Sequence, residues 1–301
     1  LDGSMEGTAD AGSYATNKFA TLYYDNYLGN PCYKETVSPV MAWKEANVSY
    51  AFYLVDEDGN PARDANGKAL ARIHIFGADS TGACIFSRIL FGGRISIIVG
   101  LGSALGAALL GVTLGLYVGY KGGLLDNLLI KISDIFQSVP QMVLIIIIVA
   151  LVGQSMQNLI IIFILTGWPG MYRMTRSKVL SLKQQEFVQA LRAFGISDVK
   201  IAFKHLLPNT LGPVVVNITL STAMFILQEA SLSVLGYGVP MEIATWGNII
   251  NVITNGGTIR FDWLQYWWMW LPCAIMLILF VLSINFIGDG LRDASDPTQI
   301  G

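Results

Sequence analysis

The feature that most constrains this chain is a series of long runs without a charged side chain. The runs cover residues 95–120, 135–172, 205–228 and 263–288. A helix needs about 20 apolar residues to cross the hydrocarbon core of a bilayer. The first, third and fourth runs each fit one crossing. The second fits two, separated at Val152-Gly153-Gln154-Ser155. The pattern therefore predicts an all-α integral membrane protein.

Five spans are expected, at residues 95–118, 128–152, 157–175, 209–235 and 264–287. Charged residues make up 13% of the chain, about half of the roughly 25% usual in soluble domains. A large soluble protein with buried helices would need polar helix faces, which these runs lack. Six glycines in the first span predict close helix packing: Gly100, Gly102, Gly106, Gly111, Gly115 and Gly119.

Basic residues predict the orientation, because Lys and Arg near span ends collect on the cytoplasmic side. The segment between the third and fourth spans carries Arg173, Arg176, Lys178, Lys183, Arg192, Lys200 and Lys204 against only Glu186 and Asp198. We therefore expect this segment and a tail at 291–301 to be cytoplasmic. Residues 1–85 are expected to be extracytoplasmic, with the membrane domain at 86–290.

The segment at 1–85 is expected to face water. Its apolar stretches at 51–55 and 69–75 flank two Asp-Gly or Asn-Gly turn signals, which favours a β-hairpin over a calcium loop. Cys32 and Cys84 fall in this segment, either as a disulfide or as two free thiols. No basic-then-apolar signal region precedes it. We expect that a sixth span, upstream of these residues, is missing from this chain.

Residues 180–208 predict a helix, a turn and a second helix. Apolar residues at helical spacing are expected to form one face of each helix: Phe187, Val188, Leu191 and Phe194, then Val199, Ala202, Phe203 and Leu206. Gly195 suits the first helix's C-terminus, Ser197 can cap the second, and Pro208 is expected to end it. The pattern allows two interpretations, a loop lying on lipid headgroups or a lever that fits a partner's groove.

Motif spacing across residues 75–298 resembles the C-type permease subunit of the bacterial dipeptide, oligopeptide and nickel ABC importers. The motifs are 189–191 (QAL) with Gly195 and 205–208 (HLLP), 165–170 (LTGWPG), 229–238 (EASLSVLGYG), 245–247 (TWG), and 285–293 (NFIGDGLRD) with Asp296-Pro297. The family's loop usually begins Glu-Ala-Ala, so Gln189 lacks a carboxylate that Glu186 could replace. Ala83-Cys84 stands where the family usually has Arg-Asp.

The resemblance implies the type I ABC importer permease fold, a multi-pass protein of the bacterial inner or plasma membrane. It implies a homologous B-type permease subunit, two ABC ATPase subunits, an extracytoplasmic peptide-binding protein and the lipid bilayer as partners, and no nucleic acid. ATP and Mg²⁺ would be used by the ATPases. This chain has no phosphate-binding Gly-x-x-x-x-Gly-Lys-Ser/Thr loop and is expected to be non-catalytic, without a cofactor or metal of its own.

The resemblance also implies that the segment at 180–208 docks onto the ATPases. The expected coupling residues are Glu186, Gln189, Ala190, Arg192, Ala193, Gly195, Asp198, Lys204, His205 and Pro208. Trp168, Gln228 and Glu229 are candidates for the translocation pathway. Glu229 is acidic inside a predicted span, which marks either a pathway or a local backbone pair near the outer interface. Trp168-Pro169-Gly170 is expected to kink the third span.

Peptides are the expected substrate, with nickel chelates, glutathione or oligosaccharides as alternatives within the family. A channel or secondary transporter would need intramembrane charge pairs or interrupted repeats, and the runs are nearly free of charge. A membrane enzyme would need a cluster of acids, histidines or metal ligands. Only His74 and His205 are histidines, and the predicted topology separates them across the membrane.

Overall fold

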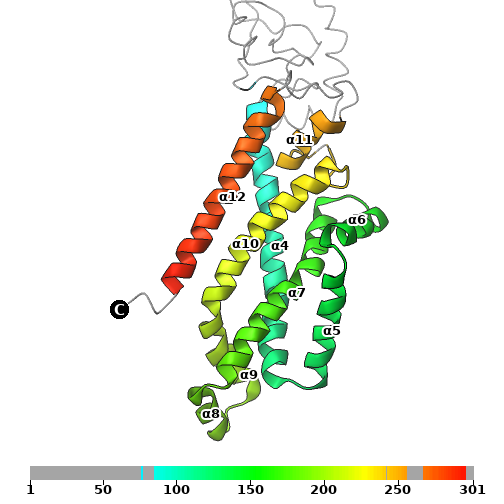
Figure 1. Cartoon of the computed structure of the whole chain (residues 1–301). Coiled ribbons are helices and arrows are strands. Elements are labelled where there is room, and N and C mark those ends of the chain that lie inside the picture. The colour runs from blue at the N-terminus through cyan, green and yellow to red at the C-terminus, as the bar shows by residue number, and fades with distance from the viewer. Residues whose placement is uncertain (1–75, 77–84, 242, 256–266, 296–301) are drawn as a thin grey trace, which may run out of the picture. The chain divides into compact units, whose positions relative to one another are not determined.

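The computed structural model describes residues 76, 85–241, 243–255 and 267–295 (Figure 1). The elements are α4 (Ile85–Lys121), α5 (Leu124–Ser138), α6 (Gln141–Val152), α7 (Met156–Lys183), α8 (Glu186–Ala193), α9 (Asp198–Lys200), the π-helix η3 (Ile201–Leu206), α10 (Leu207–Val234), α11 (Trp246–Asn255) and α12 (Trp267–Ser295). In this part of the chain every regular element is helical, as predicted. The expected hairpin, Cys32 and Cys84 lie outside the described residues.

The chain divides into two compact units. The first contains Leu1–Ile95 and Ser233–Ile278, and the second contains Ser96–Leu232 and Leu279–Gly301. Trp246 organises the described part of the first unit. Its indole Nε1 donates to the Ile89 carbonyl oxygen at 2.9 Å, and Cys273 Sγ lies 3.5 Å from the Trp246 carbonyl oxygen. The candidate functional residues lie in the second unit.

Small residues let α4 approach α7 closely within the second unit. A Cβ at Gly111 would lie 2.7 Å from the Trp168 carbonyl oxygen, and one at Gly115 would lie 3.0 Å from that of Tyr172. Side chains at these positions would force the helices apart, which confirms the predicted packing role. The prediction is wrong for Gly102, because open space surrounds that position.

The predicted span at 128–152 is wrong as a single helix. The chain breaks between α5 and α6, which are bent by 90° from each other. Pro140 cannot donate a backbone N–H, and the preceding Val139 takes an extended conformation (φ −98°, ψ 137°), as residues before proline usually do. The predicted break at 152–155 is confirmed, with Gly153 at φ +93° and Ser155 capping α7 through the Asn158 N–H at 3.0 Å.

In the described part of the chain, three helical runs are long and apolar enough to cross a membrane, at Ile85–Lys121, Asp198–Val234 and Trp270–Asp293. The bent α5–α6 pair meets the same standard as one unit. The third predicted span, in α7, is not among these runs. α7 also continues through Pro169 as one element. The count of five spans stays a prediction.

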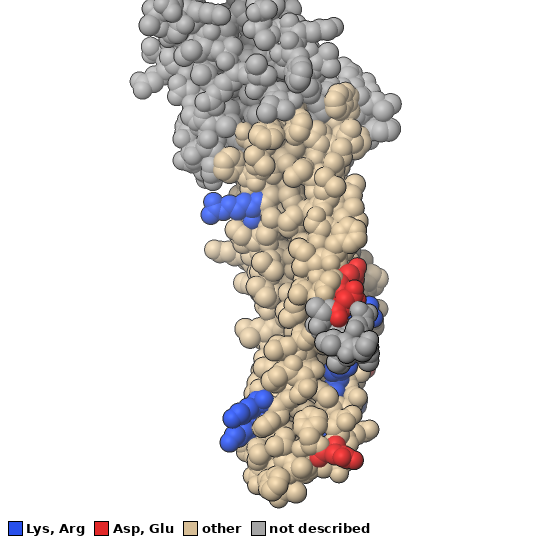
Figure 2. Space-filling view, turned by 90° about the vertical axis from the view of Figure 1, so that its left-hand side faces the viewer, with Lys and Arg blue, Asp and Glu red and all other residues tan. Residues whose placement is uncertain are grey.

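The surface of these helices suits a hydrocarbon solvent. Large apolar side chains stand exposed along them, among them Leu109 at 72%, Leu151 at 82% and Phe286 at 72% of their full exposure. On the face drawn in Figure 2, broad uncharged areas separate a few charged groups. Exposed apolar surface on this scale marks contact with lipid or another protein.

Polar contacts join α5 to α7 in the second unit. Asp126, in the first turn of α5, accepts from Arg176 through both carboxylate oxygens at 2.6 Å and from the Tyr172 hydroxyl at 2.9 Å. Asp126 is nearly buried, and Arg176 is about a quarter exposed. Two turns further along α5, Asp134 pairs with Arg173, but both of these side chains are largely exposed.

This difference in burial predicts unequal effects of removing the two charges. Asp126→Asn leaves the Arg176 guanidinium without its carboxylate in a mostly dry setting. We expect roughly 2–3 kcal/mol of destabilisation, somewhat less than for a fully buried pair. Asp134→Asn is the matched control and is expected to change stability by less than about 1 kcal/mol. Thermal unfolding of the purified protein in detergent measures both, and equal effects would contradict the role given to burial.

Candidate functional site

The turn at Gly195 has the geometry expected from the sequence. α8 ends with two backbone hydrogen bonds, from the Ile196 N–H to the Leu191 carbonyl oxygen at 3.2 Å and from the Gly195 N–H to that of Arg192 at 2.9 Å. Gly195 has φ +70°, a conformation that glycine adopts without strain. This pair of bonds is a Schellman motif. The motif connects α8 to α9 and gives the carbonyl oxygens of Leu191 and Arg192 hydrogen-bond donors.

The second predicted helix differs from the expectation. Ser197 is the N-cap residue of α9, but its side chain makes no capping hydrogen bond. Pro208 does not end the helix, because the helical run continues from Asp198 to Val234. The π-helix η3 absorbs the proline by widening the preceding turn, so that the Leu207 N–H donates to the Ala202 carbonyl oxygen. The wider turn removes the need for an α-helical N–H at Pro208.

The apolar residues of the loop divide between two sides, and the predicted single faces are wrong. Val188, Ile201 and Leu206 are fully buried. They pack in one cluster with residues from three long helices, Leu116 and Tyr120 of α4, Val179 of α7 and Val214 of α10. Four other apolar side chains point to the surface: Phe187 at 41%, Phe194 at 81%, Val199 at 52% and Phe203 at 38% exposure. We call these four the outer apolar patch.

The predicted coupling residues lie around this patch. Exposed members are Glu186, Gln189, Ala190, Arg192, Ala193, Gly195, Asp198, Lys204 and Pro208, and His205 is half-buried. Gln189 Nε2 donates to the Gln184 carbonyl oxygen at 3.3 Å. All ten residues lie on the α8–η3 segment and the start of α10, next to the end of α7 in Figure 1.

Tyr120 links this segment to α4, and sequence reasoning missed it. Lys183 Nζ donates to the Tyr120 carbonyl oxygen at 2.6 Å. The Tyr120 ring is buried and carries two cations over it, Lys183 Nζ at 5.5 Å and the Arg192 guanidinium at 5.4 Å from the ring centroid. Cation–π contacts of this kind are favourable. Arg192 therefore fixes α8 against the end of α4 as well as facing outward.

The three pathway candidates occupy different places. Glu229 is fully buried and accepts from Ser96 Oγ at 3.3 Å. Trp168 is buried with its ring against Phe136 and Tyr172.

Of the three candidates, only Gln228 lines a pocket of about 250 Å³, together with Gln137, Gln141, Thr166 and Ser221. Its Oε1 is buried and has no hydrogen-bond partner among the described residues. Sequence reasoning missed Gln137 and Gln141, although both flank Pro140.

A metal centre is not formed by the described residues, where no three His, Cys, Asp or Glu side chains cluster. The exposed side chains of the loop are apolar, amide and charged groups.

Residues 111–300 match the family described as binding-protein-dependent transport system inner membrane component. The chain is 37% identical over 224 residues to the dipeptide transport system permease protein DppC of Bacillus subtilis, covering 74% of this chain and 68% of that protein. It is 40% identical over 227 residues to the oligopeptide transport system permease protein OppC of Escherichia coli, covering 74% of this chain and 72% of that protein.

The fold is similar to a solved chain in an inward-facing conformation of the MetNI methionine ABC transporter. The TM-score is 0.56 at 21% sequence identity, covering 70% of this chain and 98% of that one. At this identity the likeness shows the fold alone, the type I importer permease arrangement.

Proposed function

The chain belongs to the family of binding-protein-dependent transport system inner membrane components, and on this premise we propose that it forms half of the pore of an ATP-driven bacterial importer of di- and oligopeptides. The names of its relatives favour peptides over nickel chelates, glutathione or oligosaccharides. In this proposal the chain itself is non-catalytic. Partner ATPases hydrolyse ATP with Mg²⁺, and a binding protein delivers the peptide from outside.

The observation that carries the proposal is the two-sided loop. The outer apolar patch faces away from the protein, while Val188, Ile201 and Leu206 lie in the cluster shared by α4, α7 and α10. Packed interiors transmit displacement because they deform little. A force applied to the patch therefore acts on three long helices at once.

The same arrangement favours a protein partner over lipid headgroups. Val188 and Leu206 are absorbed into the core, so no continuous apolar face is left to lie on a bilayer. Instead, the four side chains of the outer apolar patch stand among polar residues. We propose that they fill a groove on an ATPase subunit. When the ATPase subunits close, this groove would contact the loop differently in the two conformations of the permease. A difference in contacts between two conformations shifts the equilibrium between them.

The remaining partners and the orientation follow from the family and from charge. We propose a homologous B-type permease subunit as the second half of the pore and two ATPases, one for each half. The basic segment at 173–204 supports a cytoplasmic position for the loop. Residues 1–85 are then extracytoplasmic and the tail is cytoplasmic.

Co-purification tests the assembly and the patch together. The tagged chain is expected to bring down two ATPases and a second permease. Phe194→Ser is expected to weaken ATPase retention by roughly tenfold or more, since burying a Phe side chain is worth about 1.5–3 kcal/mol, while the second permease stays bound.

Leu124→Ser is the matched control, because Leu124 is 89% exposed but lies outside the loop. Full retention of the ATPases by Phe194→Ser would contradict the docking role of the patch. Absence of any ATPase from the wild-type complex would contradict the importer itself.

The Gly195 turn is expected to matter mechanically. A Cβ at this position meets no atom within 4 Å, so a substitution acts through backbone strain alone. Gly195→Val is expected to strain the turn by roughly 1–2 kcal/mol and to reduce ATP-driven peptide uptake, with membrane insertion intact.

Gly195→Asn provides the control, because Asn tolerates positive φ. Peptide uptake into right-side-out vesicles that contain ATP, compared with ATP hydrolysis in the same preparation, measures the coupling. Wild-type uptake by Gly195→Val would show that the turn is not a mechanical joint.

For the pathway, we propose Gln228 with Gln137 and Gln141. Three neutral amides can donate to and accept from any peptide backbone without selecting a side chain. Trp168 and Glu229 are proposed to support the surrounding helices, since neither lines this pocket.

Gln228→Leu is expected to lower peptide uptake roughly tenfold, because an unmade hydrogen bond to a buried partner costs about 1–3 kcal/mol. Gln157→Leu, an exposed position outside the pocket, serves as the control. Initial uptake rates at several peptide concentrations separate the two variants. Equal rates would remove Gln228 from the pathway.

A further inference from the structure

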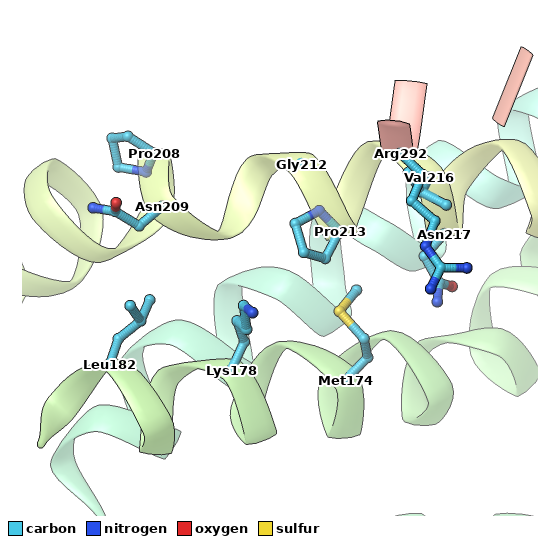
Figure 3. Close-up of a pocket in the computed structure, with 10 residues that line it drawn as sticks. All are labelled: Met174, Lys178, Leu182, Pro208, Asn209, Gly212, Pro213, Val216, Asn217 and Arg292. Atoms are coloured by element: carbon cyan, nitrogen blue, oxygen red, sulfur yellow. The ribbon is translucent and has the colours of Figure 1, made fainter. Parts of the chain in front are cut away.

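A larger pocket of about 870 Å³ opens between α7 and α10 (Figure 3). All its lining residues belong to the second unit. Figure 3 shows Met174 and Lys178 directed from α7 toward α10, and Arg292 descending from α12 beside Asn217. Gly288 allows this approach, because a Cβ there would lie 2.6 Å from Thr219 Oγ1 of α10. One turn later, the same helix carries Arg292 to the pocket.

The charge of this pocket is uncompensated. Lys178 and Arg292 line it, and no carboxylate does. Among the described residues, neither cation forms an ion pair. Arg173 and Arg176, five and two residues before Lys178 on α7, are both paired with α5 carboxylates. Of these three α7 cations, Lys178 is the one without an ion pair among the described residues, and it points toward α10 (Figure 3).

The predicted span limits put the pocket near one membrane surface. Lys178 and Arg292 follow the predicted span ends at 175 and 287 by three and five residues. Asn209 is the first residue of the predicted span at 209–235. The pocket then lies at the boundary between hydrocarbon and water, on the side where basic residues collect. Phosphate groups of lipids occupy that level.

The rest of the lining suits a group that is polar at one end and apolar at the other. Asn209 and Asn217 offer amide donors, whereas Met174, Leu182 and Val216 offer apolar surface. Arg and Lys both bind phosphate oxygens well, Arg through two parallel N–H groups. Basic pockets between spans on the cytoplasmic side suit anionic headgroups.

We infer that this pocket binds the phosphate group of an anionic phospholipid. Lys178 and Arg292 neutralise the phosphate, and the apolar residues contact the first part of an acyl chain. The phosphate chemistry is shared with free inorganic phosphate, but only a lipid uses the apolar lining. The site is independent of the transported substrate.

Native mass spectrometry of the assembled importer, titrated with phosphatidylglycerol, tests the site. The wild-type complex is expected to bind phosphatidylglycerol in preference to phosphatidylcholine. The double variant Lys178→Gln, Arg292→Gln is expected to bind it roughly tenfold more weakly, because each cation near an anionic headgroup contributes attraction. The double variant Lys121→Gln, Lys131→Gln, which removes two exposed cations elsewhere in the same unit, is expected to match the wild type.

A charge-preserving pair, Lys178→Arg with Arg292→Lys, is expected to retain binding and shows that loss in the neutral variant is not misfolding. Several results would overturn the proposal. They are equal affinity for phosphatidylcholine, unchanged binding in the neutral variant, and loss of binding in the charge-preserving pair. Displacement of the lipid by millimolar inorganic phosphate would also overturn it, because the bound group would then be free phosphate.

Discussion

Hydrocarbon provides no hydrogen-bond partners, so every backbone N–H and C=O placed in it must be satisfied within the protein. The described chain meets this constraint with helices and with local repairs where they break. Ser155 receives the Asn158 N–H at the start of α7. Near Pro208, the Asn209 side chain donates to the His205 carbonyl oxygen at 2.7 Å, and Thr210 Oγ1 donates to that of Leu207 at 2.8 Å. At these two places side chains supply hydrogen bonds to the backbone.

A small set of polar and apolar contacts links the loop to the long helices. Lys183 and Arg192 hold the end of α4 through Tyr120, and Val188 enters the core beneath them. An electrostatic contact and an apolar one therefore act between the same elements. One side of the loop packs into the cluster with α4, α7 and α10, and the other side carries the outer apolar patch.

Long uncharged runs and motif spacing were enough to predict the helical class, the family and the Gly195 turn. Other features depend on neighbours that are distant in sequence. Phe187 and Val188 are equally apolar side by side, and only the positions of α4 and α10 decide that Val188 is buried. Tyr120 lies 63 residues from Lys183, beyond the reach of local patterns. Pro140 and Pro208 were visible, but a proline permits a kink, a break or a widened turn, and tertiary packing decides which occurs.

The widened turn at η3 also sets a direction. An α-helix advances about 100° per residue, and a π-turn holds one residue more than an α-turn. The segment before Ile201 is therefore rotated by roughly that angle from where an uninterrupted α10 would carry it. The extra residue of the π-turn in η3 therefore determines the direction in which Phe194 and Val199 point relative to α10. Loss of that residue would turn the segment before Ile201 by roughly the same angle and would move Val188 out of its cluster with α4, α7 and α10.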